Sequence, residues 1–393
     1  MSAILGLVIL AAIAYAGSLH IFSKEKLPPL LRYLFYTGWE FMLIGIIIGP
    51  FALDFFPEFL LRELEPVIHL GLGWVGLLIG AQMRLTDLAR VERWQLRLTL
   101  YQALISGLLV MLAVYLPLHY LYKRGIADAV IAAAVLAASA AVSSPTVLAL
   151  LGKERRFNAT ARQLLNVVSS LDAMVAVVLL ALSLTVLRHG IASFTLGLKY
   201  LAQAAGTGLL LGFFFRHLPR EKLKEKEQMV LMVGFVFFSA GVGGVLSVSP
   251  LVISFIAGAF LANTLRPEDP LYRAASNTER PFYIIMLLLA GLMFVPSPLA
   301  FPIALLVALV RLLAKQHSLR WLLGRRAAPF PFPKSGGLAL ASQGAMALVI
   351  GFAYLSVENG GMGRDVFSII VLCVMLNEMA APFLIGRVLA EER

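Results

Sequence analysis

Long apolar runs, separated by short polar stretches, recur along the whole chain. Taking about 20 residues as one crossing of a bilayer, the pattern predicts about thirteen transmembrane helices. The expected spans are 3–22, 33–53, 66–83, 98–120, 127–151, 163–187, 193–215, 228–247, 249–264, 281–295, 298–314, 336–357 and 365–387. The pattern thus predicts an all-α polytopic membrane protein, with residues 1–393 forming a single transmembrane domain.

The composition supports this fold class. Of the 393 residues 60% are hydrophobic and 14% are charged, more apolar surface than a soluble domain can bury. The net charge of +11 does not indicate nucleic acid as a partner, because the basic residues lie scattered between apolar runs. Residues 3–22 lack a cleavage motif, so we expect a retained helix and not a signal peptide.

Lysine and arginine predict the orientation. The loops after every odd-numbered helix, with the C-terminal tail, hold 26 of the 33 basic residues. Since cytoplasmic loops are enriched in Lys and Arg, we expect the N-terminus outside, the C-terminus in the cytoplasm, and the protein in the cell (inner) membrane. Lys315 is counted here with the loop that follows residues 298–314.

Two weak internal similarities predict an inverted repeat. Residues 77–83 resemble 288–294, and 45–50 resemble 257–263; each pair lies about 210 residues and seven helices apart. An odd number of helices inverts the second copy, an arrangement found in many secondary transporters. The expected division is a first repeat over about 1–187, a linker helix over about 193–215 and a second repeat over about 228–387.

One carboxylate lies deep in a predicted span. Asp172 stands in the apolar stretch 166–182, with Ser169 and Ser170 just before it. A charged group at such a depth costs at least about 2.5–3.5 kcal/mol, so it needs a partner, a water-filled cavity or a function. A structural Asp bonded to a neighbouring helix is one interpretation. We favour the other, an ion or proton site.

Two predicted helices carry signals of interruption. Pro145 lies inside 127–151 and breaks the hydrogen-bond ladder, while Ser143, Ser144 and Thr146 offer hydroxyls to the freed backbone groups. An ordinary proline kink would give the same pattern. In 336–357, the stretch 342–344 (Ser-Gln-Gly) predicts a second break. Paired breaks at equivalent positions indicate a binding site near the middle of the membrane.

Two further charged residues are candidate electrostatic partners. Arg311 is expected about a turn from the end of its helix, from which it snorkels to the surface or reaches inward to a carboxylate. Glu378 lies beside Asn377 inside 365–387.

We expect no cofactor and no enzymatic activity. The six histidines lie near helix ends without ligand spacing, and Cys373 is the one cysteine. The chain has no Walker motif either. An intramembrane aspartyl protease would need a second deep Asp.

A buried carboxyl group suits exchange of cations for protons. Burial raises the pKa of a carboxyl group and a nearby cation opposes that rise, so one site can hold either a proton or a cation. Oxygen ligands from Asp172, the serines and broken-helix carbonyls match a hard monovalent ion.

The chain resembles, over essentially its full length, the monovalent cation:proton antiporter superfamily, of the sodium/hydrogen exchanger type. The similar segments are 44–50, 143–147, 170–172, 249–262, 279–282, Arg311 with Lys315, and Asn377-Glu378 followed by Pro382. The resemblance implies crossed broken helices 5 and 12, a core moving against a dimerisation domain, a homodimer, and Asp172 as the carboxylate that binds Na⁺ or K⁺ and the proton.

The sequence departs from this family in two places. Members show Asn-Asp or Asp-Asp where this chain has Leu171-Asp172, and one branch has an acid where Ser144 stands. A single carboxylate favours electroneutral exchange. The alternative is a sodium-coupled organic-anion symporter of the bile-acid type, which would need a second polar Na⁺ site and a roomier cavity.

Overall fold

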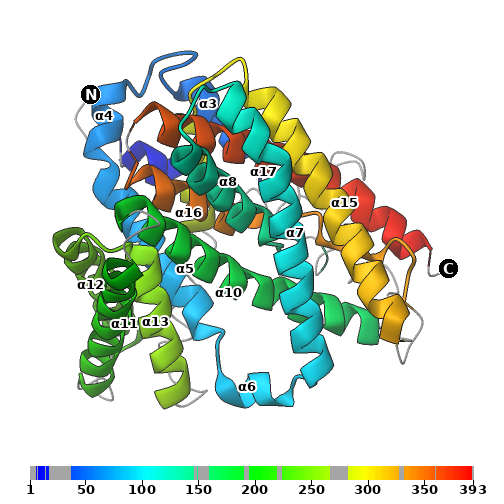
Figure 1. Ribbon diagram of the computed structural model, residues 1–393. Coiled ribbons are helices and arrows are strands. Elements are labelled where there is room, and N and C mark those ends of the chain that lie inside the picture. Colours follow the sequence, from blue (N-terminus) through cyan, green and yellow to red (C-terminus); the bar gives the residue numbers. More distant parts are fainter. Residues whose placement is uncertain are drawn as a thin grey trace. The chain divides into compact units, whose positions relative to one another are not determined.

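The computed structural model describes residues 6, 8–13, 15–16, 37–145, 148, 159–189, 194–218, 224–265, 282–326, 332–358 and 360–391. Within these ranges the regular structure is helical throughout (Figure 1). Six of the described helices are long and apolar enough to cross a membrane, and five shorter apolar helices accompany them. This confirms an all-α polytopic membrane protein, while the number of thirteen crossings stays a prediction.

The chain forms two compact units, and each is assembled from separate segments. The first contains Met1–Ser18, Phe56–Val91 and Leu184–Met286. The second contains Leu19–Phe55, Glu92–Ser183 and Leu287–Arg393.

Close helix packing organises the first unit. Its helices include α4 (Glu58–Glu63), α5 (Glu65–Ala81), α6 (Leu85–Arg90), α11 (Phe194–His217), α12 (Glu225–Leu246) and α13 (Pro250–Thr264). Gly76 and Gly80 of α5 and Gly258 of α13 lie so near the facing backbone that a Cβ would collide with a carbonyl oxygen. Small residues of this kind let membrane helices approach closely, which explains the extensive contact of α5 with α13.

The second unit holds most of the long helices. Its elements are α3 (Glu40–Ile48), α7 (Arg93–Tyr120), α8 (Ile126–Ala141), α10 (Ala159–His189, as far as Ser183), α15 (Ala300–Arg326), the 3₁₀ turn η2 (Gly336–Leu340), α16 (Gly344–Leu355) and α17 (Gly361–Ala390). Helix α7 packs against both α8 and α15, and α17 packs against α15 and α16. Figure 1 shows α7 (cyan) and α15 (yellow) side by side.

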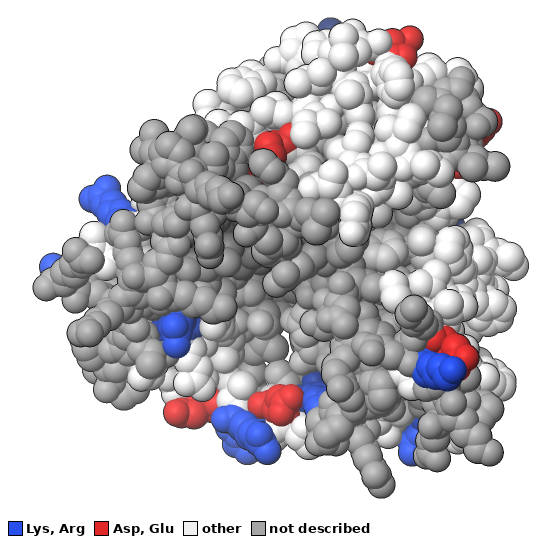
Figure 2. Space-filling model, turned by 180° about the vertical axis from the view of Figure 1, so that it is seen from behind, with Lys and Arg blue, Asp and Glu red and all other residues white. Residues whose placement is uncertain are grey.

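One face of the molecule carries few charged side chains among the described residues. On the face seen in Figure 2, those of the described residues are few, and a broad area carries none. Exposed apolar side chains follow the outer faces of α7, α11 and α12, including Leu112, Phe214 and Phe238. Lipid is the solvent that suits such faces.

The prediction for the helix at 298–314 is wrong at its end. Helix α15 continues to Arg326, so Lys315 is not in a loop but in the middle of a helix. The reason is the apolar pattern beyond it, because Leu319 and Leu323 recur at helical spacing and are buried. The sequence prediction ends the helix at this charged residue, whereas Lys315 is a buried member of the helix. Two short helices, α4 and α6, were also not predicted.

Candidate functional site

Both predicted interruptions are present, and they meet inside the second unit. Helix α8 ends at Ala141, after which Val142 is extended. The turn η2 ends at Leu340, and α16 begins at Gly344. The backbone N–H of Ser144 donates to the carbonyl oxygen of Ser342 over 2.8 Å, so the two non-helical stretches touch.

Gly344 is required where the two stretches meet. Its φ of +66° lies in the left-handed region, which glycine adopts without steric cost. A Cβ at this position would also come within 2.9 Å of the Ser144 Cβ. The residue therefore serves both the turn and the close approach of the two chains.

Arg311 binds the ends of two half-helices. The side chain is fully buried on α15. Its guanidinium donates to the carbonyl oxygens of Ala140 (3.1 Å) and Val142 (2.6 Å) at the end of α8. It also donates to those of Leu340 (3.0 Å) and Ala341 (2.7 Å) at the end of η2.

The last carbonyls of a helix have no partner within the helix and carry partial negative charge, so a cation stabilises them. The expected position of Arg311 near a helix end is wrong. Its hydrogen bonds go to backbone carbonyls, neither to the surface nor to a carboxylate.

Glu378 binds the beginning of α16, the half-helix that follows the second interruption. It is buried on α17, and its Oε1 accepts hydrogen bonds from the backbone N–H groups of Gln343 (2.6 Å) and Gly344 (2.7 Å). The Ser342 hydroxyl donates to it over 3.0 Å. Because the N-terminus of a helix carries partial positive charge, a carboxylate is the favourable group there. Each described half-helix end is thus neutralised by a side chain of opposite charge.

Gln343 ties the second interruption to its neighbours. Its amide nitrogen donates to the Ser139 carbonyl oxygen of α8 over 3.0 Å. Its amide oxygen accepts from Nδ2 of Asn377 on α17 over 2.9 Å. A buried amide satisfied on both sides fixes the orientation of this stretch.

Asp172 and Lys315 form a buried ion pair beside the first interruption. Both side chains are completely inaccessible, and Lys315 Nζ lies 3.3 Å from Oδ2 of Asp172. The backbone N–H of Ser143 donates to Oδ1 over 3.1 Å. The ammonium also donates to the Ser143 hydroxyl (2.6 Å) and to the Ala141 carbonyl oxygen (2.7 Å). Three acceptors match the three donors of an ammonium group.

The remaining predicted residues have different surroundings. Ser144 belongs to the contact with Ser342, through its backbone. The Ser169 hydroxyl donates to the Leu165 carbonyl oxygen of its own helix over 2.9 Å. Ser170 is half-buried on α10, and Thr146 lies outside the described residues.

Lys315 was not among the candidate site residues. The signal that could have found it is its spacing from Arg311, because residues four apart share one face of a helix. The apolar residues that continue beyond it were the second signal.

The chain is similar to known proteins over nearly its whole length. The family model described as "Sodium/hydrogen exchanger, transmembrane" matches residues 8–391. A solved structure of the sodium proton antiporter MjNhaP1 from Methanocaldococcus jannaschii at pH 8 is 19% identical, with a TM-score of 0.69 and complete coverage of both chains. An electron-microscopy structure of the same antiporter gives 16% identity and a TM-score of 0.64, again over both whole chains. No curated protein matches the sequence.

Proposed function

Because the chain belongs to the sodium/hydrogen exchanger family and is a cation/proton antiporter, we propose that Asp172 is the group at which cation and proton compete. One observation supports this most directly. The Asp172 carboxylate is completely buried and is paired with an ammonium group, that of Lys315, at 3.3 Å. Family membership also displaces the organic-anion symporter as the alternative.

The Lys315 ammonium occupies the place that a transported cation would need. Its three hydrogen bonds go to a carboxylate, a hydroxyl and a backbone carbonyl. Oxygen atoms of these kinds are the ligands that hard cations prefer. A monovalent cation therefore replaces the ammonium at Asp172, Ser143 and Ala141, and it leaves when the carboxylate takes up a proton.

Broken helices supply these ligands without a cost in secondary structure. The Ala141 carbonyl oxygen is available as a ligand because α8 ends there, and the Ser143 N–H holds the Asp172 carboxylate by donating to its Oδ1. Arg311 and Glu378 hold the half-helix ends through their opposite charges and do not need to touch the cargo. Their role is to keep the two interrupted stretches in one geometry where they touch, at Ser144 and Ser342.

A single carboxylate at the pair favours electroneutral exchange of one cation for one proton. If Lys315 stays protonated, the site carries the same charge with a proton on Asp172 as with a cation bound. The cation in this proposal is Na⁺ or K⁺. The inverted repeat, the homodimer, the inner-membrane location and the outside N-terminus remain predictions.

The test is proton flux in proteoliposomes with an imposed pH gradient, followed by a pH-sensitive dye after addition of Na⁺, K⁺ or Li⁺. Asp172→Asn should abolish cation-dependent flux. Asp128→Asn is the matched control, because Asp128 is exposed in the first turn of α8, and it should exchange like the wild type. Full flux in a folded Asp172→Asn protein would refute the assignment of Asp172. Flux that changes with membrane potential would refute electroneutrality.

A further inference from the structure

Two polar side chains of α7 are buried without a hydrogen-bond partner among the described residues. Gln102 and Ser106 are both 0% exposed, and both amide atoms of Gln102 and the hydroxyl of Ser106 are unpaired within the described part of the chain. An unsatisfied buried polar group costs about 1–3 kcal/mol. A pair of them one turn apart on one helix indicates a place built to bind a polar group.

The faces of α7 show where this pair points. Gly107 lies against α8, since a Cβ there would be 3.3 Å from the Ala137 carbonyl oxygen. Ile105 and Leu109 line a groove of about 1060 Å³ that α7 shares with α15. With 3.6 residues per turn, Gln102 and Ser106 fall between these two faces. The pair therefore lies toward the wedge between α8 and α15.

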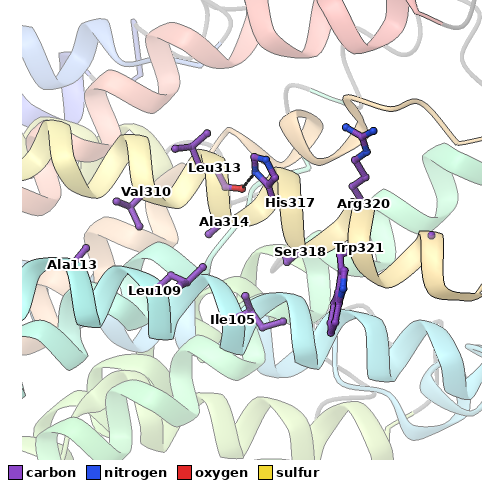
Figure 3. A pocket seen from close by; sticks show the side chains of 11 residues that line it. Ile105, Leu109, Ala113, Val310, Leu313, Ala314, His317, Ser318, Arg320 and Trp321 are labelled. Atoms are coloured by element: carbon purple, nitrogen blue, oxygen red, sulfur yellow. Dashed lines mark hydrogen bonds between the residues drawn. The ribbon is translucent and has the colours of Figure 1, made fainter.

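Lys315 crosses the same wedge, because it extends from α15 to the Ala141 carbonyl at the end of α8. Figure 3 shows α7 and α15 running in opposite directions along the groove, with residues 105–113 facing 310–321. Ser106 and Lys315 therefore lie at neighbouring levels of the two helices. Gln102 lies one turn further along α7, toward Leu98, which shares a buried cluster with Leu319.

Cation binding creates a need for hydrogen-bond acceptors in this wedge. A cation at Asp172, Ser143 and Ala141 takes the three oxygens that now bind the Lys315 ammonium. An ammonium group in a dry interior cannot be left without acceptors, because its desolvation is too costly. Its flexible four-carbon stem allows it to move to another set of oxygens.

We propose that Gln102 and Ser106 form the second binding place of the Lys315 ammonium. The Gln102 carbonyl oxygen and the Ser106 hydroxyl accept it, directly or through a water molecule that they hold, while the cation occupies Asp172. Both are positioning residues that act through Lys315. The inference rests on the proposed function, since it requires a cation to displace the ammonium.

The test measures cation binding in the purified full chain. The apparent Kd for Na⁺, and in parallel for K⁺, is obtained from the dependence of the thermal unfolding midpoint on salt, at constant ionic strength with choline chloride. Gln102→Leu removes the acceptor at similar volume, and Ser106→Ala is a smaller change in case the first variant does not fold. Gln228→Leu, at another buried glutamine in the first unit, is the matched control.

Gln102→Leu should raise the apparent Kd about tenfold, the loss of one hydrogen bond to a charged group, and Gln228→Leu should leave it unchanged. In a Lys315→Met background, Gln102→Leu should have no further effect, because the ammonium that it serves is gone. An equal rise of Kd in both backgrounds, or no rise in either folded variant, would overturn the proposal. If the wild type itself shows neither cation binding nor cation-dependent proton flux, the proposed exchange site has failed and not the role of Gln102.

Discussion

Replacement of Glu378 should destabilise the protein by an amount that depends on what the new side chain leaves unpaired. Glu378 accepts from two backbone N–H groups, those of Gln343 and Gly344, and from the Ser342 hydroxyl. Glu378→Leu leaves both N–H groups buried without an acceptor, at about 1–3 kcal/mol each, so we expect a loss of about 2–6 kcal/mol. Glu378→Gln keeps one acceptor oxygen but loses the charge, and we expect about 1–3 kcal/mol.

The assay is equilibrium unfolding in mixed detergent micelles, followed by tryptophan fluorescence. Glu63→Gln serves as the control, since this residue is exposed at the end of α4, and it should unfold like the wild type. The order wild type, Glu378→Gln, Glu378→Leu is expected for decreasing stability. If Glu378→Leu is as stable as the wild type, the start of α16 does not depend on a carboxylate and the charge argument is wrong.

Two other substitutions test how the two interrupted helices are held together. Gly344→Ala should lower stability by about 1–3 kcal/mol, because φ is +66° and the added Cβ meets Ser144; an unchanged unfolding midpoint would contradict this. Arg311→Lys keeps the charge but has no planar fork to reach the carbonyls of both α8 and η2. It should lose about 1–3 kcal/mol in the same unfolding assay, whereas full stability would show that charge alone suffices at this position.

The sequence was sufficient for the features that depend on local chemistry. Pro145 cannot continue a helix ladder, and the Ser-Gln-Gly stretch at 342–344 is polar and flexible, so both interruptions were predictable. The depth of Asp172 in an apolar run likewise identified it as a residue that needs a partner.

Which partner each charge finds was beyond the sequence, because that depends on how distant helices cross. Lys315 reaches Asp172 across 143 positions of sequence, and Glu378 reaches back to Gln343 from the next helix. The pattern of charges marked Lys315 as the end of a helix, although the apolar positions after it kept the helix going. A lone charge in an apolar run is ambiguous in this way until its partner is known.

The contact between Ser144 and Ser342 has a consequence for how the carrier works. The first interruption cannot straighten unless that hydrogen bond and the Arg311 contacts to the carbonyls of Ala140 and Val142 break together. The crossing is therefore stiff, although it is made of non-helical chain. If Asp172 beside this contact is the exchange site, as proposed, a stiff contact keeps the same ligands around the cation whichever side water reaches it from. Its preference among ions should then be the same in both directions of transport.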